Sequence, residues 1–124
     1  MFILTDEQTS QMLSSLISYC KDYYLKVSDV SLRVCIKHLD LVLEANKTTN
    51  LTRILNVDDA AVLHILDSLI LLPYLNKAPE GALLDMGTGA GFPGIPLTIA
   101  SGRKATYIDS VGKQVDAVNS FVKE

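Results

Sequence analysis

Apolar residues recur at helical spacing through the first half of the chain. Thr5 followed by Gln8 is a capping-box signature, which predicts a helix from about residue 6 to residue 24. Its inner face would be formed by Met12, Leu13, Leu16, Ile17, Cys20 and Tyr23. A second helix is predicted from about Ser31 to the polar cluster at residues 46–50, with an inner face formed by Cys35, Ile36, Leu39, Val42 and Leu43.

A third helix is predicted from about residues 56–59 to Leu72, because polar and acidic side chains suit its start and Pro73 helps to end it. After a turn at residues 76–81 the pattern changes. Short apolar runs at 82–86 and 104–108 are typical of strands. A helix is expected between them, over 93–101, and a final amphipathic helix from about Lys113. Gly102 stands where a glycine commonly ends a helix.

Two strands joined through a helix are expected to be parallel, with a right-handed crossover. Parallel sheets are normally larger and covered on both faces, so two strands form only part of one. The pattern therefore predicts an α/β chain with an incomplete sheet. We expect a helical extension over residues 1–75 and the start of a β-α-β-α domain over 76–124.

Composition narrows the functional classes. The chain has 124 residues, and its 48% hydrophobic content argues against disorder. The formal net charge of −3 provides no general attraction to nucleic acid, so any RNA contact must be local or lie outside this sequence. The longest apolar stretch, residues 60–72, is too short for a membrane span and is interrupted by His64 and Asp67. The start lacks the features of a secretory signal, and the cytoplasm is the expected location.

The segment at residues 83–94 carries the clearest functional signal. It consists of an apolar run, an acidic residue, a turn with three glycines and a helix opened by proline. Gly87, Gly89 and Gly91 are spaced G-x-G-x-G, whereas the dinucleotide fingerprint G-x-G-x-x-G requires a glycine where this chain has Phe92. The spacing therefore favours a cofactor other than a nicotinamide dinucleotide.

Charge around this turn indicates which cofactor it suits. Asp85 is expected at its mouth, and no Lys or Arg lies between residues 80 and 101 to meet a phosphate. S-adenosyl-L-methionine, with its sulfonium and ammonium groups, fits this charge. Asp109 ends the next strand about 24 residues later, where a carboxylate can accept hydrogen bonds from both ribose hydroxyls. Asp109 alone does not exclude NAD, and a turn without a ligand is the simplest alternative.

Four segments together resemble one enzyme family. They are Asn50-Leu51-Thr52, His64 to Leu69, the glycine segment through Leu97, and Tyr107 to Lys113. The chain resembles the small-subunit ribosomal RNA guanine-N7 methyltransferases, also called glucose-inhibited division protein B, over roughly residues 10–124. One departure is Ala45-Asn46, where the family usually has Trp-Asn.

The resemblance implies a class I, Rossmann-like, S-adenosylmethionine-dependent methyltransferase. Its seven-stranded, mostly parallel sheet follows a helical extension, and only the first two strands fit into this sequence. It further implies methylation of guanine N7 in 16S ribosomal RNA, either free or in an assembling small subunit. The chain then matches the amino-terminal part of such an enzyme, and alone it is expected to be inactive. The alternative is a non-catalytic module that binds cofactor weakly or self-associates through open sheet edges.

Roles for single residues follow from the pattern and the resemblance. Cofactor binding is predicted for Asp85, Gly87, Gly89, Gly91, Phe92, Asp109 and Ser110, with Asp85 toward the methionine end, Asp109 and Ser110 toward the ribose, and Phe92 through its backbone N–H. No residue is predicted to act as a general acid or base, and no metal site is predicted.

The roles of several polar side chains outside this set remain open. His64 and Asp67 are expected to share a helix face, either as a hydrogen-bonded pair beneath the glycine turn or at the RNA or cofactor cleft. His38 is expected at a helix surface or boundary. RNA contact is considered first for Arg53, then for Lys47, Arg103, Lys104 and Lys113. Cys20 and Cys35 lack metal-ligand spacing and are expected to be buried free thiols.

Overall fold

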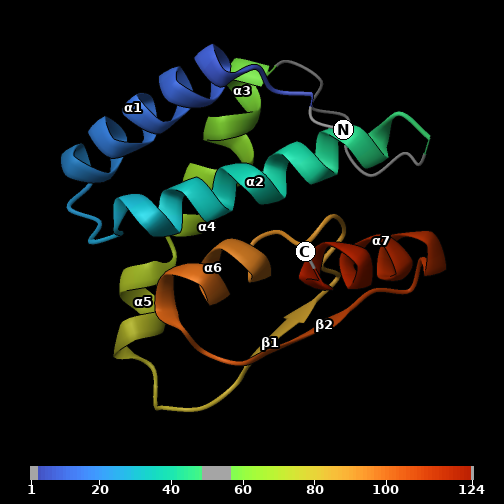
Figure 1. Cartoon of the computed structure of the whole chain (residues 1–124). Coiled ribbons are helices and arrows are strands. Elements are labelled where there is room, and N and C mark those ends of the chain that lie inside the picture. Colours follow the sequence, from blue (N-terminus) through green and yellow to red (C-terminus); the bar gives the residue numbers. More distant parts are fainter. Residues whose placement is uncertain (1–2, 49–56, 124) are drawn as a thin grey trace.

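The computed structural model describes residues 3–48 and 57–123, and two long helices form its amino-terminal part (Figure 1). Helix α1 (Asp6–Asp22) begins with the predicted capping box. The Thr5 hydroxyl oxygen accepts the N–H of Gln8, and the Gln8 side chain accepts the N–H of Thr5, both at 3.0 Å. Helix α2 (Asp29–Asn46) begins slightly earlier than predicted, after Ser28, whose hydroxyl oxygen accepts a backbone N–H at the helix start.

The third helical segment is less regular than predicted. It consists of α3 (Val57–Ala60), the π-helix η1 (Ala61–Leu66) and α4 (Asp67–Leu69). A further helix, α5 (Leu72–Lys77), begins where the third helix was expected to end and extends into the turn expected at residues 76–81, and Pro73 lies in its first turn. Proline is well suited to that position because its missing N–H would have no partner there. Among the helices that the structure describes, none combines the length and apolar character needed to cross a membrane.

The main hydrophobic core lies between α1, α2 and the α3–α4 segment. Its fully buried side chains include Leu16, Leu32, Leu39, Ile65 and Leu69. Cys20 and Cys35 are buried free thiols in this core, as predicted. Burial raises the pKa of Cys35 to about 12, so this thiol is not activated for nucleophilic chemistry.

The second half contains the predicted β-α-β-α arrangement. Strands β1 (Leu83–Met86) and β2 (Ala105–Ile108) pair in parallel, with α6 (Gly94–Ser101) between them in sequence. Helix α6 ends at Gly102, whose left-handed backbone (φ 72°) explains the glycine. Helix α7 (Gly112–Lys123) follows β2. A second core cluster joins this half to α2 and consists of Val42, Ala90, Ile95, Val118 and Phe121.

The two faces of the small sheet have different surroundings. Asp85 pairs with Tyr107 on the face that packs against α6, on the same side as Leu83 and Ala105. Figure 1 shows α6 and α7 on one side of the strands. Leu84, Met86 and Ile108 point to the other face, where they are 54%, 74% and 46% exposed. Within the described residues, this apolar face is therefore uncovered.

Arg103 fastens the connection between α5 and β1. Its guanidinium donates to four backbone carbonyls, those of Leu75 (2.9 Å), Ala78 (3.3 Å), Pro79 (2.8 Å) and Gly81 (3.3 Å). Five donors in one planar group make arginine suited to such a cluster. Arg103, which precedes β2, thus holds residues 75–81, which precede β1, in place.

Candidate functional site

Residues 87–93, between β1 and α6, form the glycine loop. The N–H groups of its first two residues both donate to the carbonyl of Ile108, at 2.7 and 3.0 Å. The loop then folds back on itself, because the N–H groups of Gly91 and Phe92 both donate to the carbonyl of Thr88 (2.9 and 3.1 Å). It is thereby held at the carboxyl ends of both strands, the edge at which open α/β sheets bind ligands.

Asp85 supports the glycine loop from inside. Its Oδ2 accepts the Thr88 hydroxyl (2.7 Å) and the N–H of Gly94 at the start of α6 (2.9 Å), and the residue is only 8% exposed. The expectation that Asp85 stands open at the mouth of the turn is therefore wrong. Gly94, to which no role was assigned from sequence, permits this contact, since a Cβ there would lie 2.5 Å from Asp85 Oδ2.

Asp109 meets the same loop from the end of β2. Its Oδ1 accepts the N–H of Val111 and its Oδ2 accepts the N–H of Gly89, both at 2.9 Å. These two N–H groups, that of Val111 first, lower the pKa of the Asp109 carboxyl. With its amide nitrogen turned toward the carboxylate, Gln114 lies 3.1 and 3.0 Å from the two oxygens. The two predicted acidic residues thus bind one loop, and Ser110 is exposed beside them.

The three loop glycines serve different purposes. Gly87 and Gly89 have positive φ angles (74° and 60°), and a Cβ on either would have no atom within 4 Å. Their backbone is consequently open to an approaching ligand. Gly91 (φ 102°) is buried, and a Cβ there would meet Ile95 and His38. The expectation that Gly91 makes room for cofactor is therefore wrong, because protein side chains fill that space.

Phe92 does not offer its backbone N–H to a ligand as expected, because that N–H donates to the carbonyl of Thr88 within the loop. Its ring instead lies between two histidines. The His64 ring stacks on it with a centroid distance of 4.3 Å and an interplanar angle of 11°. The His38 ring lies 4.7 Å away, tilted by 38°. Phe92 therefore joins the glycine loop to both α2 and η1.

His38 is buried, which corrects its expected place at a helix surface or boundary. Its Nε2 lies 2.9 Å from the carbonyl oxygen of Ala90 in the glycine loop. Burial, with a smaller contribution from His64, lowers the pKa of His38 to about 4, although the bond to Ala90 acts in the opposite direction. The ring is thus neutral at pH 7. The sequence contained a signal of this burial, because His38 lies one helical turn from both Cys35 and Val42, on a side of the helix that it shares with buried residues.

The comparison with known proteins identifies the family. The family model described as rRNA small subunit methyltransferase G, GidB, matches residues 32–124. The chain belongs to the GidB family. A ribosomal RNA small subunit methyltransferase G from Alkaliphilus oremlandii is 40% identical over 101 residues, which are 81% of this chain and 41% of the relative.

Other curated relatives of the same name agree with this assignment. The one from Haemophilus influenzae is 34% identical over 114 residues, covering 91% of this chain and 55% of the relative. The one from Escherichia coli is 37% identical over 105 residues, covering 84% and 49%. This GidB-family chain spans about half the length of the curated relatives it matches. The resemblance seen in the sequence is confirmed.

The departure from the Trp-Asn pattern leaves α2 intact in this GidB-family chain. The helix continues through Ala45 to Asn46, and Ala45 packs against the second core cluster. The missing large side chain therefore does not interrupt the helix that carries His38.

His64 and Asp67 do not form the expected pair beneath the loop. His64 is half-buried against Phe92, and burial lowers its pKa, whereas Asp67 is exposed. The π-helix explains the difference, since its wider turn changes which residues share a face. His64 is therefore part of the packing around the glycine loop, and Asp67 is a surface residue.

The candidate RNA-contacting cations have different surroundings. Arg103 is occupied by backbone carbonyls, and Lys47 lies 3.4 Å from Glu44 on the same helix face. Lys104 is exposed. Arg53 and the side chain of Lys113 lie outside the described part of the GidB-family chain. The described residues thus identify no cationic surface at the glycine loop.

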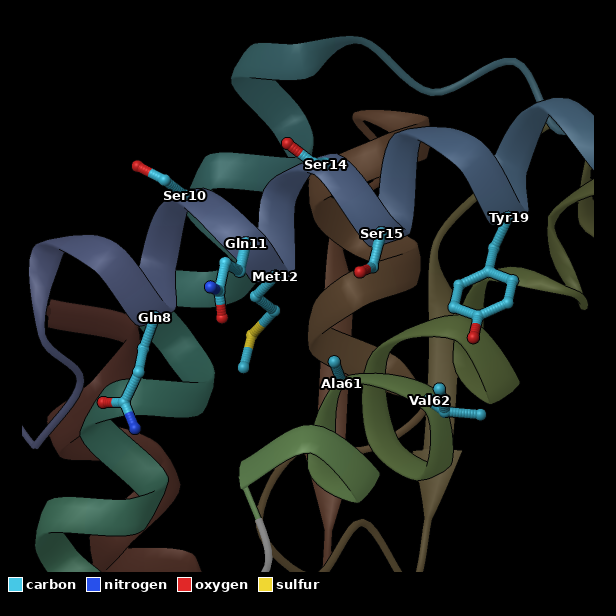
Figure 2. Close-up of a pocket in the computed structure, with 9 residues that line it drawn as sticks. All are labelled: Gln8, Ser10, Gln11, Met12, Ser14, Ser15, Tyr19, Ala61 and Val62. Carbon is cyan, nitrogen blue, oxygen red and sulfur yellow. The ribbon is translucent and has the colours of Figure 1, made fainter.

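A groove of about 570 Å³ lies between α1 and η1, away from the glycine loop. Figure 2 shows Met12, Ser15 and Tyr19 on the side of α1 that faces Ala61 and Val62. Its lining carries no acidic or basic side chain, and no orphaned buried polar atom belongs to it. The size of this groove alone does not indicate a function, so we keep the glycine loop as the candidate site of this GidB-family chain.

Proposed function

We propose that this chain forms the methyl-donor site of an S-adenosyl-L-methionine-dependent enzyme that methylates guanine N7 in 16S ribosomal RNA. The main support is that Asp85, one residue before the end of β1, and Asp109, directly after β2, hydrogen-bond the same glycine loop through Thr88 and Gly89. On this proposal, residues 76–124 begin a Rossmann-like class I domain and residues 1–75 are its helical extension. The proposed substrate is free 16S RNA or an assembling small subunit, which places the protein in the cytoplasm.

The residues around the loop fit a cationic nucleoside cofactor. Gly87 and Gly89 leave their backbone open on one side. Each Asp109 oxygen accepts one backbone N–H, and the remaining acceptor positions of the carboxylate face the Gln114 amide, which ribose hydroxyls would displace. Ser110 lies beside it. Asp85 uses only Oδ2 for the loop, so its second oxygen can orient the methionine end directly or through water.

The chemistry explains why no general base is needed. S-adenosyl-L-methionine supplies an electrophilic methyl group on a sulfonium. Guanine N7 is an acceptor with a free lone pair and requires no deprotonation before it attacks. Catalysis can therefore depend on orientation, for which effective molarities of about 10⁵–10⁸ M are known in favourable cases. The residues of this chain would bind and orient, and none is assigned a catalytic role.

A variant at Gly89 tests the cofactor site. Asparagine tolerates the left-handed backbone that Gly89 adopts, and its Cβ would enter open space, so Gly89→Asn should fold normally. Its side chain would occupy the path of the cofactor. We expect calorimetry to show that the affinity for S-adenosyl-L-methionine falls at least tenfold, which corresponds to a loss of about 1.4 kcal/mol of binding free energy.

Gly102→Asn is the matched control, because Gly102 also has a left-handed backbone (φ 72°) and open space but lies at the far end of α6. It should bind the cofactor like the parent chain. Equal affinity of the Gly89 and Gly102 variants would overturn the residue assignment. Tighter binding of NAD than of S-adenosyl-L-methionine by the parent would overturn the choice of cofactor.

Methyl transfer is tested on the complete gene product and on the 124-residue chain in parallel. Each is incubated with S-adenosyl-L-methionine and small subunits that lack the modification, and digested 16S RNA is analysed for 7-methylguanosine by mass spectrometry. We expect the complete protein to form the product and the 124-residue chain to form none, because the latter spans only about half of its relatives. Absence of product with the complete protein would refute the proposed reaction.

Self-association of the isolated chain is a second candidate, favoured by the uncovered sheet face. Met86 is 74% exposed on that face, and Met86→Lys would place a charge in any contact between two copies. We expect the mass of the parent, measured by light scattering, to rise with concentration and that of the variant to stay monomeric. Val30→Lys is the control, since Val30 is equally exposed (71%) but lies on α2. A parent that is monomeric at all concentrations would remove this candidate.

A further inference from the structure

His38 is the point at which the amino-terminal helices contact the glycine loop through a polar group. Its Nε2 lies 2.9 Å from the carbonyl oxygen of Ala90, which is 52 residues away in sequence. A carbonyl oxygen can only accept a hydrogen bond, so Nε2 must carry the proton and Nδ1 must be unprotonated in the neutral ring. The geometry therefore determines the tautomer of His38.

The unprotonated Nδ1 makes His38 hard to explain by packing alone. This nitrogen is buried and has no hydrogen-bond partner within the described residues. A buried polar atom without a partner destabilises the fold, and an aliphatic side chain of similar size would avoid that cost. Within the described residues, the bond to Ala90 is the contact of His38 that a hydrocarbon side chain could not make.

That bond fixes one peptide unit of the glycine loop. The carbonyl of Ala90 accepts from His38, while the N–H of the same peptide, on Gly91, donates to the carbonyl of Thr88 (2.9 Å). Rotation of this peptide would break both bonds. The His38 ring also lies against Phe92, so His38 contacts the loop on both sides of Gly91, at Ala90 and at Phe92.

Both halves of the loop are consequently anchored to other elements. The first half is bonded to Asp85 and to the end of β2 through Ile108 and Asp109, and the second half is bonded to α2 through His38. A binding loop held in one conformation loses less entropy when its ligand arrives, and it binds more tightly for that reason. We propose that His38 is a positioning residue that holds the glycine loop in its cofactor-binding conformation by donating to Ala90.

This inference rests on the proposed function, and a matched pair of variants tests it. In His38→Gln the amide nitrogen can still donate to Ala90, whereas His38→Leu fills the site with an apolar side chain that has no donor. We expect the leucine variant to bind S-adenosyl-L-methionine roughly tenfold more weakly and the glutamine variant within about threefold of the parent. In the complete enzyme, the leucine substitution should raise the KM for the cofactor and leave kcat almost unchanged.

Amide hydrogen exchange gives a test that needs no ligand. In the free protein, the N–H groups of Gly91 and Phe92 should exchange faster in the leucine variant than in the parent or the glutamine variant. Equal exchange and equal cofactor affinity in all three proteins would overturn the role of His38. A parent that fails to bind the cofactor would instead refute the proposed function, while the exchange result would still decide whether His38 orders the loop.

Nitrogen NMR of the parent protein covers the case in which the leucine variant does not fold. The His38 ring should show a protonated Nε2 and an unprotonated Nδ1 at neutral pH. The opposite tautomer, with the proton on Nδ1, is incompatible with donation to Ala90 and would overturn the proposal without any substitution.

Discussion

Replacing Gly91 with alanine should destabilise the protein by roughly 2–6 kcal/mol, combining about 1–3 kcal/mol each for backbone strain and overpacking. Its backbone (φ 102°) is one that residues with a Cβ rarely adopt. The new Cβ would collide with Ile95 and would lie 3.1 Å from Nε2 of His38, with little free space around it. Urea denaturation followed by circular dichroism should show the loss as a lower midpoint.

Gly89→Ala is the control for this experiment. Gly89 also has a positive φ (60°), but a Cβ there meets no atom within 4 Å. Only the backbone cost remains, about 1–2 kcal/mol. The difference between the two alanine variants therefore measures the crowding around Gly91. If both variants were equally stable, the close contact of Gly91 with His38 and Ile95 would be wrong.

Acid should destabilise the protein in a pH range set by His38. Its pKa is about 4 in the folded state, against 6.5 for an unperturbed histidine, so between these values the unfolded chain binds more protons. The free energy of unfolding should then fall as the pH drops from about 6.5 to about 4, by about 3 kcal/mol in total. Burial also lowers the pKa of His64, which adds a change of the same sign.

His38→Gln isolates the contribution of His38, because glutamine does not titrate in this range. Chemical denaturation at pH 7 and at pH 4 should show a smaller stability difference in the variant than in the parent, by about 3 kcal/mol. The Asp109 carboxyl, whose pKa is lowered, loses its stabilising effect only at lower pH and so does not obscure this comparison. Identical pH profiles for the two proteins would show that His38 is not buried in its neutral form.

Local signals predicted most of the secondary structure. The capping box at Thr5 and the left-handed Gly102 each depend on a few adjacent residues, and both are confirmed. The parallel pairing of the two strands was predictable because a helix separates them. The π-helix and α5 were missed, since regular spacing does not reveal one extra residue in a turn and Pro73 is equally consistent with the end or the start of a helix.

The sequence identified most residues of the candidate site, but it did not show which way their side chains point or what surrounds them. Sequence placed Asp85 at a strand end, but which face of so short a strand it occupies depends on packing against α6. The burial of His38 was indicated by its buried neighbours on α2, but its partner, Ala90, lies 52 residues away and no local pattern connects the two. Gly91 was assigned to the cofactor because spacing alone cannot tell whether the space beside a glycine is empty or filled by another helix.

The four carbonyls gathered by Arg103 have a consequence for engineering this protein. Arg103 precedes β2 and its acceptors precede β1, so donor and acceptors lie at the same end of the parallel pair, where the guanidinium holds residues 75–81 together. The connection between α5 and β1 is therefore a poor site for inserting an affinity tag or a fused domain. An insertion there would separate the four carbonyl groups that now accept hydrogen bonds from one guanidinium. Lysine in place of Arg103 could not restore these bonds, because its ammonium group is compact and carries fewer donors.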